Sequence, residues 1–281
     1  MSDPTRPSRA PAQPGECFGD WQCHTAASVI EVADKCVFKW ATIKIFKRAK
    51  KTKLAKAGEI GVHCHSEAEK ARKGQITVSD LSTLARVAYD AVPSGQWEAE
   101  KHIDHQDVGL PWKLFGKRDL IDQRRHRIWD YKFSSDPVKW MPGDPASDHV
   151  EPPPGPRPVD WEPVKRLSAD TQMVLYSWAH LQLTGVIPEI GHVQTNVNTG
   201  VSRRVWTRIP PVELVRQWLR IRDVVLRMHR ASQQKPEEIE TCGYPGRGPA
   251  CWAFNKRCEA YDFCLETERD RPRSQTSKWE V

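Results

Sequence analysis

Two neighbouring segments of the chain combine acidic, basic and apolar side chains at strand-like spacing. Gly116-Lys117-Arg118-Asp119 comes first, and Asp130-Tyr131-Lys132 follows after a polar stretch. Alternate side chains of a strand share one face, so Asp130 and Lys132 point the same way, and Asp119 lies beside Asp130 if the segments form a hairpin. Two close carboxylates repel each other, and a divalent cation removes that repulsion. Magnesium or manganese suits such ligands and activates water against a phosphodiester, while Lys132 orients the water or stabilises the developing charge.

A D-x-K pattern by itself is common and also fits an exposed ion pair on a hairpin, so the surrounding segments matter. Thr171–Tyr176 carries Gln172 and Tyr176 at i, i+4 spacing, which places both on one face of a helix. Further upstream, Gly61–Glu69 carries two histidines, His63 and His65. Glu100, just before the hairpin, is a weaker candidate for a further acidic contact, because a solvent-facing strand charge is its ordinary explanation.

These four segments, in this order, resemble the motifs of RecB-like PD-(D/E)XK nucleases. The shared motifs are G-x-x-x-H with a Glu four residues on, G-x-x-D, D-x-K and QxxxY. The resemblance implies that Mg²⁺ or Mn²⁺ is held by His65, Asp119, Asp130 and the backbone carbonyl of Tyr131. It further implies that Lys132 assists the attacking water, that Gln172 supports the site, and that Tyr176 positions DNA or packs beneath it. The register leaves His63 as the alternative to His65.

Eight cysteines are many for a protein whose thiols are kept reduced, and clustered cysteines then indicate a metal or an iron–sulfur centre. Cys251, Cys258 and Cys264 lie close together near the C-terminus, and Cys36 lies far upstream. This arrangement resembles the iron–sulfur branch of the same family, which includes AddB-type subunits, exonuclease V and the CRISPR adaptation nucleases. The resemblance implies a 4Fe–4S cluster on these four thiolates. Cys242 could replace Cys251, structural zinc is the main rival to the cluster, and buried free thiols are the plainest alternative.

Composition favours a polyanionic partner. The chain has 281 residues, a formal net charge of +7 and a pI of about 9.0. A basic run contains Lys44, Lys47, Arg48 and Lys51, which either follows DNA phosphates or compensates a helix dipole and aids solubility. No apolar run approaches the ~20 residues of a membrane span, and no secretory signal is evident, so we expect no membrane partner and a cytoplasmic location.

The function that accounts for most of these features is a metal-dependent DNA exonuclease. Its substrate would be single-stranded DNA or duplex ends in recombination, repair or replication, with a single-strand-binding or recombination protein as a further partner. The alternatives are a catalytically weak DNA-binding or partner-docking module and a DNA endonuclease. The intact set of motif residues argues against decay of the site.

Hydrophobic periodicity predicts alternating helices and strands. Helices are expected over Ser28–Lys51 (with Ser28 and Glu31 as a capping box), Gly61–Lys73, Val78–Val92, Ser168–Thr184 (capped by Ser168 or Asp170) and Pro210–Arg230. Strands are expected within Trp97–Ile121, Arg127–Phe133 and Ile187–Thr207, with a hairpin turn over Asp122–His126.

The expected fold is α/β, and the resemblance specifies a restriction-endonuclease-like core with a central mixed sheet flanked by helices. We expect a disordered tail over 1–24 and a single nuclease domain over 25–281. Within that domain, 136–163 is a Pro-rich loop insertion and 241–281 is a cysteine-bearing segment. The N- and C-terminal parts are expected to be joined by the cluster.

Overall fold

The structure is a computed structural model that describes residues 24–48, 56–135, 162–239, 252–253 and 256–270. The chain divides into two compact units. The first comprises Met1–Lys51, Gln106–Leu114 and Arg222–Val281, and the second comprises Thr52–His105 and Phe115–Ile221. Residues 1–23 of the predicted tail, nearly all of the Pro-rich stretch and much of the cysteine-bearing segment lie outside the described residues, while His24 begins β1.

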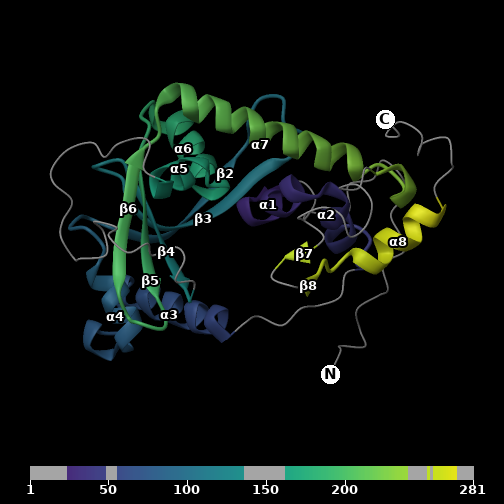
Figure 1. Cartoon of the computed structure of the whole chain (residues 1–281). Coiled ribbons are helices and arrows are strands. Elements are labelled where there is room, and N and C mark those ends of the chain that lie inside the picture. The colour runs from purple at the N-terminus through teal and green to yellow at the C-terminus, as the bar shows by residue number, and fades with distance from the viewer. Residues whose placement is uncertain (1–23, 49–55, 136–161, 240–251, 254–255, 271–281) are drawn as a thin grey trace, which may run out of the picture. The chain divides into compact units, whose positions relative to one another are not determined.

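A mixed β-sheet forms the centre of the second unit (Figure 1). Within this unit, its strands are β2 (Glu98–His105), β3 (Lys113–Asp122), β4 (Arg127–Ser134), β5 (Glu189–Asn196) and β6 (Ser202–Arg208). The order is β3-β4-β5-β6, and β2 pairs with β3. β3 and β4 form the predicted antiparallel hairpin, β4 and β5 are parallel, and β5 and β6 are antiparallel. The expected mixed sheet with flanking helices is confirmed.

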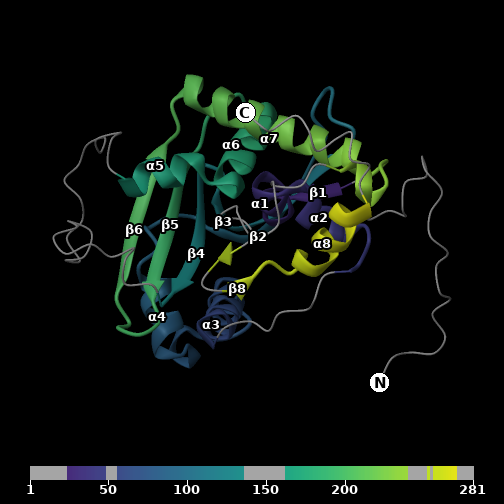
Figure 2. The same cartoon turned by 45° about the vertical axis from the view of Figure 1, so that its right-hand side comes forward.

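Two pairs of helices cover the two faces of this sheet (Figure 2). One pair is α3 (Lys56–Arg72) and α4 (Thr83–Asp90), and the other is α5 (Glu162–Ala169) and α6 (Thr171–Thr184). Ala68 of α3 and Ala88 of α4 pack against Trp129 and Tyr131 of β4. The alternate residues of β4 face α6, where Gln172 contacts Asp130. Asp130 therefore lies on the α6 face of β4, and an apolar cluster occupies the α3 face.

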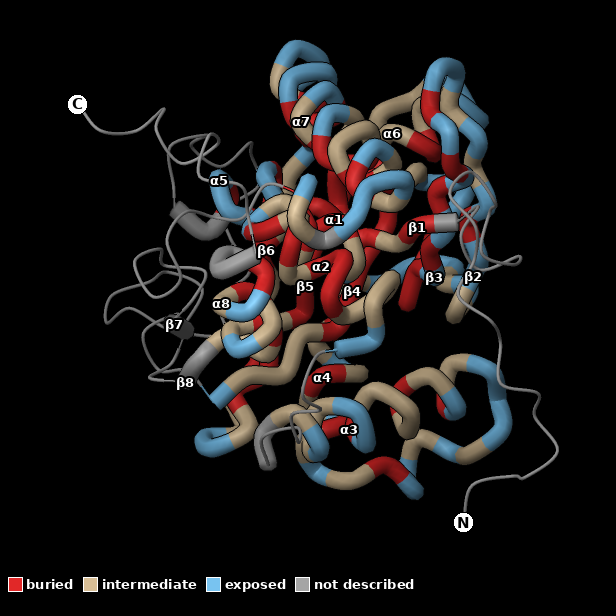
Figure 3. The backbone as a smooth tube through the Cα atoms, turned by 90° about the vertical axis from the view of Figure 1, so that its right-hand side faces the viewer, coloured by how far each residue is buried: buried red, intermediate tan, exposed pale blue. Residues whose placement is uncertain are grey.

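The middle of the sheet is buried, because helices enclose it on both sides. Ile128, Trp129, Asp130 and Tyr131 are consecutive buried residues of β4. The tube in Figure 3 is red along parts of β4 and β5 and pale blue at many turns. A strand covered on both faces normally carries apolar side chains throughout, so the buried Asp130 is an exception that needs a partner.

The first unit brings the two ends of the described chain together. It contains β1 (His24–Ala26), α1 (Ala27–Lys35), α2 (Val37–Lys44), η3 (Pro236–Glu238), β7 (Trp252–Ala253), β8 (Lys256–Arg257) and α8 (Tyr261–Asp270). The ring of Phe263 in α8 stacks on Phe38 at 5.8 Å between centroids and meets the edge of Phe46 at 5.7 Å. Helix α7 (Pro211–Ala231) runs from the second unit into the first. None of the helices in the described ranges combines the length and apolar character of a membrane span.

Several element boundaries differ from the prediction. The helix expected over Ser28–Lys51 is two helices, because Cys36 adopts an extended backbone (φ −165°, ψ 110°) between α1 and α2. The N-cap of α1 is Ala26, so the predicted Ser28 capping box is wrong. Periodicity missed this break because the apolar spacing continues through it.

Other boundaries shift for local reasons. The segment expected to begin a helix at Val78 forms the short 3₁₀ helix η1 (Val78–Asp80), because Thr77 and Asp80 make a capping box there. Asp170, one of the two proposed caps, is the N-cap of α6, and its side chain accepts from the N–H of Met173. Helix α5 was not predicted separately, because its first residues belong to the Pro-rich stretch.

Candidate active site

Two carboxylates face each other across the β3–β4 hairpin. The register pairs Leu120 with Trp129 and Ile121 with Ile128, so Asp119 lies opposite Asp130 on the same face. Both are buried, with 9% and 3% of their surface exposed. The backbone N–H of Tyr131 donates to Asp119 Oδ2 at 3.0 Å, which fixes the orientation of that carboxyl. The hairpin thus brings together the two acidic residues that the motifs predicted.

The two carboxyls differ in their affinity for a proton. Burial raises the pKa of Asp119 well above its usual value, and the nearby charge of Asp130 raises it further. Burial would also raise the pKa of Asp130, but the charge of Lys132 outweighs it and lowers that pKa. Asp119 therefore holds a proton more tightly than Asp130 does, because two adjacent buried carboxylates repel each other when both are ionised. A divalent cation can replace that proton.

Gln172 connects the ammonium group of Lys132 to the carboxyl pair. Lys132 Nζ lies 2.6 Å from Asp130 Oδ2 as an ion pair and donates to Gln172 Oε1 at 2.9 Å. The amide of Gln172 donates to Asp130 Oδ1 at 2.8 Å and to the hydroxyl of Tyr176 at 3.2 Å. The charge of Asp130 raises the pKa of Lys132 against the effect of burial, so Lys132 is an ammonium. Four predicted site residues are therefore joined in one continuous polar network.

A glycine on β3 makes room for the tyrosine of this network. Tyr176 donates its hydroxyl hydrogen to the carbonyl of Lys117 at 2.6 Å, and burial raises the pKa of this phenol to about 12. A Cβ atom on Gly116 would lie only 2.6 Å from Cε1 of the Tyr176 ring. Any other residue at position 116 would displace the ring. The G-x-x-D and QxxxY motifs are thus coupled by direct packing.

Of the two candidate histidines, His65 lies against the carboxylate pair. His65 Nε2 is 3.4 Å from Asp119 Oδ1, and its ring meets the edge of Tyr131. His63 has a 70% exposed side chain and pairs instead with Glu67, one turn further along α3. The geometry therefore favours His65 as the imidazole ligand.

A second pair of carboxylates, Glu69 and Glu100, also lies close to His65. One ligand atom from each of His65, Glu69 and Glu100 falls within 4.8 Å of the others, a spacing that metal sites also have. However, Lys73 Nζ lies 2.5 Å from Glu69 and 3.0 Å from Glu100, and Lys117 also pairs with Glu100. Burial alone would raise the pKa of Glu100, but hydrogen bonds with Glu69, Lys117 and Lys73 outweigh it and lower that pKa to about 2. Two ammonium groups therefore already balance this acidic pair.

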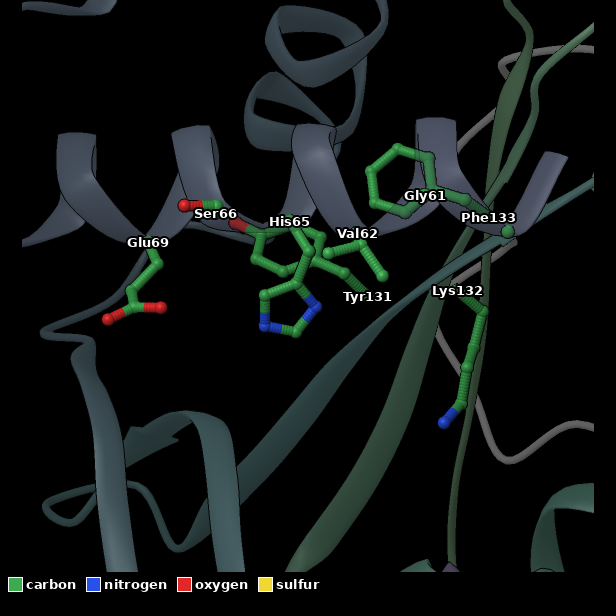
Figure 4. A pocket seen from close by; sticks show the side chains of 9 residues that line it. Gly61, Val62, His65, Ser66, Glu69, Tyr131, Lys132 and Phe133 are labelled. Atoms are coloured by element: carbon green, nitrogen blue, oxygen red, sulfur yellow. The ribbon is translucent and has the colours of Figure 1, made fainter. Parts of the chain in front are cut away.

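A pocket of about 480 Å³ opens between α3 and β4 (Figure 4). Its lining residues are Gly58, Gly61, Val62, His65, Ser66, Glu69, Tyr131, Lys132 and Phe133. His65 and Lys132 belong to both this pocket and the carboxylate site. The volume lies within the range of ligand-binding clefts. A reacting group in the pocket would thus have access to an imidazole and an ammonium.

One buried polar residue of the site was not predicted from the sequence. His192 of β5 is paired with Asp130 in the parallel β4–β5 register, and only 6% of its surface is exposed. Burial lowers its pKa, so its imidazole is neutral. The alternation of Ile190, His192 and Gln194 could have indicated a shared face, but no local signal identifies the strand beside it.

The predicted DNA-binding residues lie in the first unit or outside the described residues. Lys51 is not described. Arg48 pairs with Glu266 at 3.4 Å and lies 5.0 Å over the ring of Phe263. Burial and the neighbouring charge of Lys44 lower the pKa of Lys47. Arg48 therefore has a packing role in this unit, and contact of this basic run with DNA stays a prediction.

Three of the four predicted cluster cysteines are described, and all three belong to the first unit. Cys36 and Cys264 are buried, and Cys258 is partly buried, while Cys251 and its alternative Cys242 lie outside the described residues. Cys36 caps α2, where its Sγ accepts from the N–H of Lys39 at 3.3 Å.

Comparison with known proteins gives a likeness among solved structures. No family model matches the chain, and no curated protein matches it. Among solved structures, the chain is similar to a protein from Eubacterium rectale described as a "putative exonuclease". The two share 15% sequence identity, the match covers 87% of this chain and 88% of that one, and the TM-score is 0.51. At this identity the likeness concerns the fold.

Proposed function

We propose that the protein is a metal-dependent DNA exonuclease whose active site is the Asp119–Asp130 pair with Lys132. The observation that carries the proposal is the closed network in which Gln172 bridges Lys132 and Asp130. A buried pair of adjacent carboxyls is costly as a purely structural feature. The same pair is well suited to a hard divalent cation, which accepts carboxylate oxygens and an imidazole.

His65, Asp119, Asp130 and the backbone carbonyl of Tyr131 would hold Mg²⁺ or Mn²⁺. The bound ion would polarise the phosphodiester and lower the pKa of a coordinated water. Lys132 would orient the attacking water or stabilise the charge that develops on the phosphate, because its ammonium borders both the carboxylates and the pocket. Gln172 would hold Lys132 and Asp130 in place, and Tyr176 would support Gln172.

DNA is the substrate that fits the charge of the chain and the kind of site. The net charge of +7 favours a polyanion. The description of the Eubacterium rectale protein supports exonuclease action on the ground of a shared fold. We infer that the physiological role is the processing of single strands or duplex ends in recombination, repair or replication.

The test is cleavage of end-labelled single-stranded and duplex DNA with Mn²⁺ or Mg²⁺. Lys132→Met is compared with Lys101→Met, which removes a half-exposed lysine that pairs with Glu98 on β2. We expect metal-dependent shortening from an end by the wild type and the control, and none by Lys132→Met. Cleavage only at internal positions would change the assignment to an endonuclease. DNA binding without cleavage by the folded wild type would refute catalysis and indicate a binding module.

We further propose that Cys36, Cys251, Cys258 and Cys264 hold a 4Fe–4S cluster. The support is the packing of α2 on α8 through Phe38 and Phe263, which places the segments that carry Cys36 and Cys264 in one unit. Anaerobic purification followed by visible spectroscopy and iron and sulfide analysis tests the assignment. Zinc in place of iron and sulfide would replace the cluster with a structural zinc site, and loss of metal in Cys251→Ala but not Cys242→Ala would identify the fourth ligand.

A further inference from the structure

His192 occupies a position in the sheet that places it beside the candidate metal ligand Asp130. The two residues are direct partners in the parallel β4–β5 register. Side chains at paired positions of neighbouring strands point to the same face, so the imidazole lies next to the carboxylate. The charges of Asp130, Lys132 and Asp170 all act on the ring, which agrees with this placement.

The imidazole also has an unused hydrogen-bonding atom in a buried place. Nε2 of His192 is buried and has no hydrogen-bond partner among the described residues. An unpaired buried polar group costs about 1–3 kcal/mol, so it is retained at a cost to stability unless a partner becomes available. Carboxylates that bind metals are themselves usually held by hydrogen bonds from a neighbouring group. The neighbouring carboxylate is the group that can use this donor.

We propose that His192 is a positioning residue that donates its Nε2–H to the Asp130 carboxylate and holds it in the orientation that binds the metal. The inference rests on the proposed metal site and goes beyond it, because it assigns a role to a residue outside the four motifs. In the structure, Gln172 and Lys132 occupy Asp130 Oδ1 and Oδ2. Each carboxylate oxygen accepts more than one hydrogen bond, so His192 can add to these contacts.

The experiment measures Mn²⁺ binding to the purified full-length chain by calorimetry and by the electron paramagnetic resonance of free Mn²⁺. His192→Leu removes the donor but keeps similar bulk, and His192→Gln restores a donor near the position of Nε2. Thr195→Val is the matched control, because Thr195 is another fully buried polar residue of β5 and pairs with Ser202 rather than with the site. Thermal unfolding of every variant confirms that it is folded.

We expect His192→Leu to bind Mn²⁺ about 10- to 100-fold more weakly than the wild type, a typical effect of losing such a supporting hydrogen bond. His192→Gln should recover most of this affinity, and Thr195→Val should bind normally. Unchanged affinity in a folded His192→Leu protein would overturn the inference and leave the metal site intact. An equal loss in His192→Gln would overturn the donor role. Absence of Mn²⁺ binding by the wild type would overturn the metal site and this inference together.

Discussion

Two pairs of carboxylates lie close to His65, and different numbers of ammonium groups neutralise their charge. Among the described residues, Asp119 and Asp130 face one ammonium, that of Lys132, whereas Glu69 and Glu100 face two, those of Lys73 and Lys117. The pKa of Asp119 in the first pair is raised well above its usual value, whereas that of Glu100 in the second is lowered to about 2. Proximity of acidic ligands is thus insufficient for predicting a metal site. The number of ammonium groups close to each pair determines how much negative charge is left for a metal ion to neutralise.

The largest expected loss of metal binding and cleavage comes from removing the negative charge of Asp130 in the first pair. Asp130→Asn should abolish Mn²⁺ binding and lower cleavage by at least about 10³-fold, roughly 4 kcal/mol of transition-state stabilisation. Asp90→Asn, which removes an exposed carboxylate paired with Arg86, is the control and should be active. Calorimetry and end-labelled DNA measure the two effects. Comparable activity of the two variants would place the chemistry elsewhere.

In metal-free protein the two pairs should respond to pH with opposite sign. The pKa of Asp119 is raised from 3.8, so its contribution to stability is present at low pH and is lost as pH rises through the raised value. The pKa of Glu100 is lowered from 4.5 to about 2, so its contribution is present above 4.5 and is lost as pH falls towards 2. Because solvent screens this group, we expect about 1–2 kcal/mol from Glu100.

Urea unfolding in a chelator, across a pH series, measures this difference. Relative to the wild type, Asp119→Asn should become more stable as pH rises. Glu100→Gln should lose stability relative to the wild type as pH rises from 2 to 4.5, the range set by the folded and unfolded pKa values of that carboxyl, and should stay less stable above it. Parallel pH profiles for the two variants would contradict the difference in charge balance.

A smaller loss of cleavage should follow from displacing Tyr176, which holds Gln172 in place beside the first pair. Gly116→Ala places a Cβ atom against the Tyr176 ring and should cost about 1–3 kcal/mol of stability, with about a tenfold loss of cleavage as Gln172 shifts. Chemical denaturation and the cleavage assay measure these changes. The double variant Gly116→Ala/Tyr176→Leu should be no less stable than Tyr176→Leu alone. An additive loss would show that the glycine acts independently of the ring.

The smallest effect is expected at the second pair. Glu100→Gln should leave Mn²⁺ affinity within about fivefold of the wild type, since a lysine-paired carboxylate contributes at most about 1 kcal/mol. Glu98→Gln on the same strand is the control. Calorimetry gives both affinity and stoichiometry, and loss of a Mn²⁺ equivalent in Glu100→Gln alone would reveal a second metal site at His65, Glu69 and Glu100.

Helix phase explains why the sequence could not choose between the two histidines. His63 and His65 are two positions apart on α3, so their side chains diverge by about 200° around the axis. Only one can face the sheet. The packing of Gly61 against Phe133 and of Ala68 in the apolar cluster decides that His65 does so. That choice depends on residues more than 60 positions away in the chain.

Spacing within a segment was sufficient for the parts of the site that lie on one element or one hairpin. The i, i+4 pair Gln172 and Tyr176, the alternation of Asp130 and Lys132, and the short turn between β3 and β4 all follow from local backbone geometry. The mixed α/β character followed from periodicity in the same way. These features need no knowledge of distant partners.

Tertiary structure decided the features that depend on packing between segments. The parallel pairing of β4 with β5, after α5 and α6, places His192 beside Asp130. The approach of Lys73 and Lys117 to Glu100 turns an apparent ligand set into a neutral ion-pair cluster. In both cases the physical reason is the same. Burial and charge balance are properties of the residues that surround a side chain in space, and local spacing does not specify which residues those are.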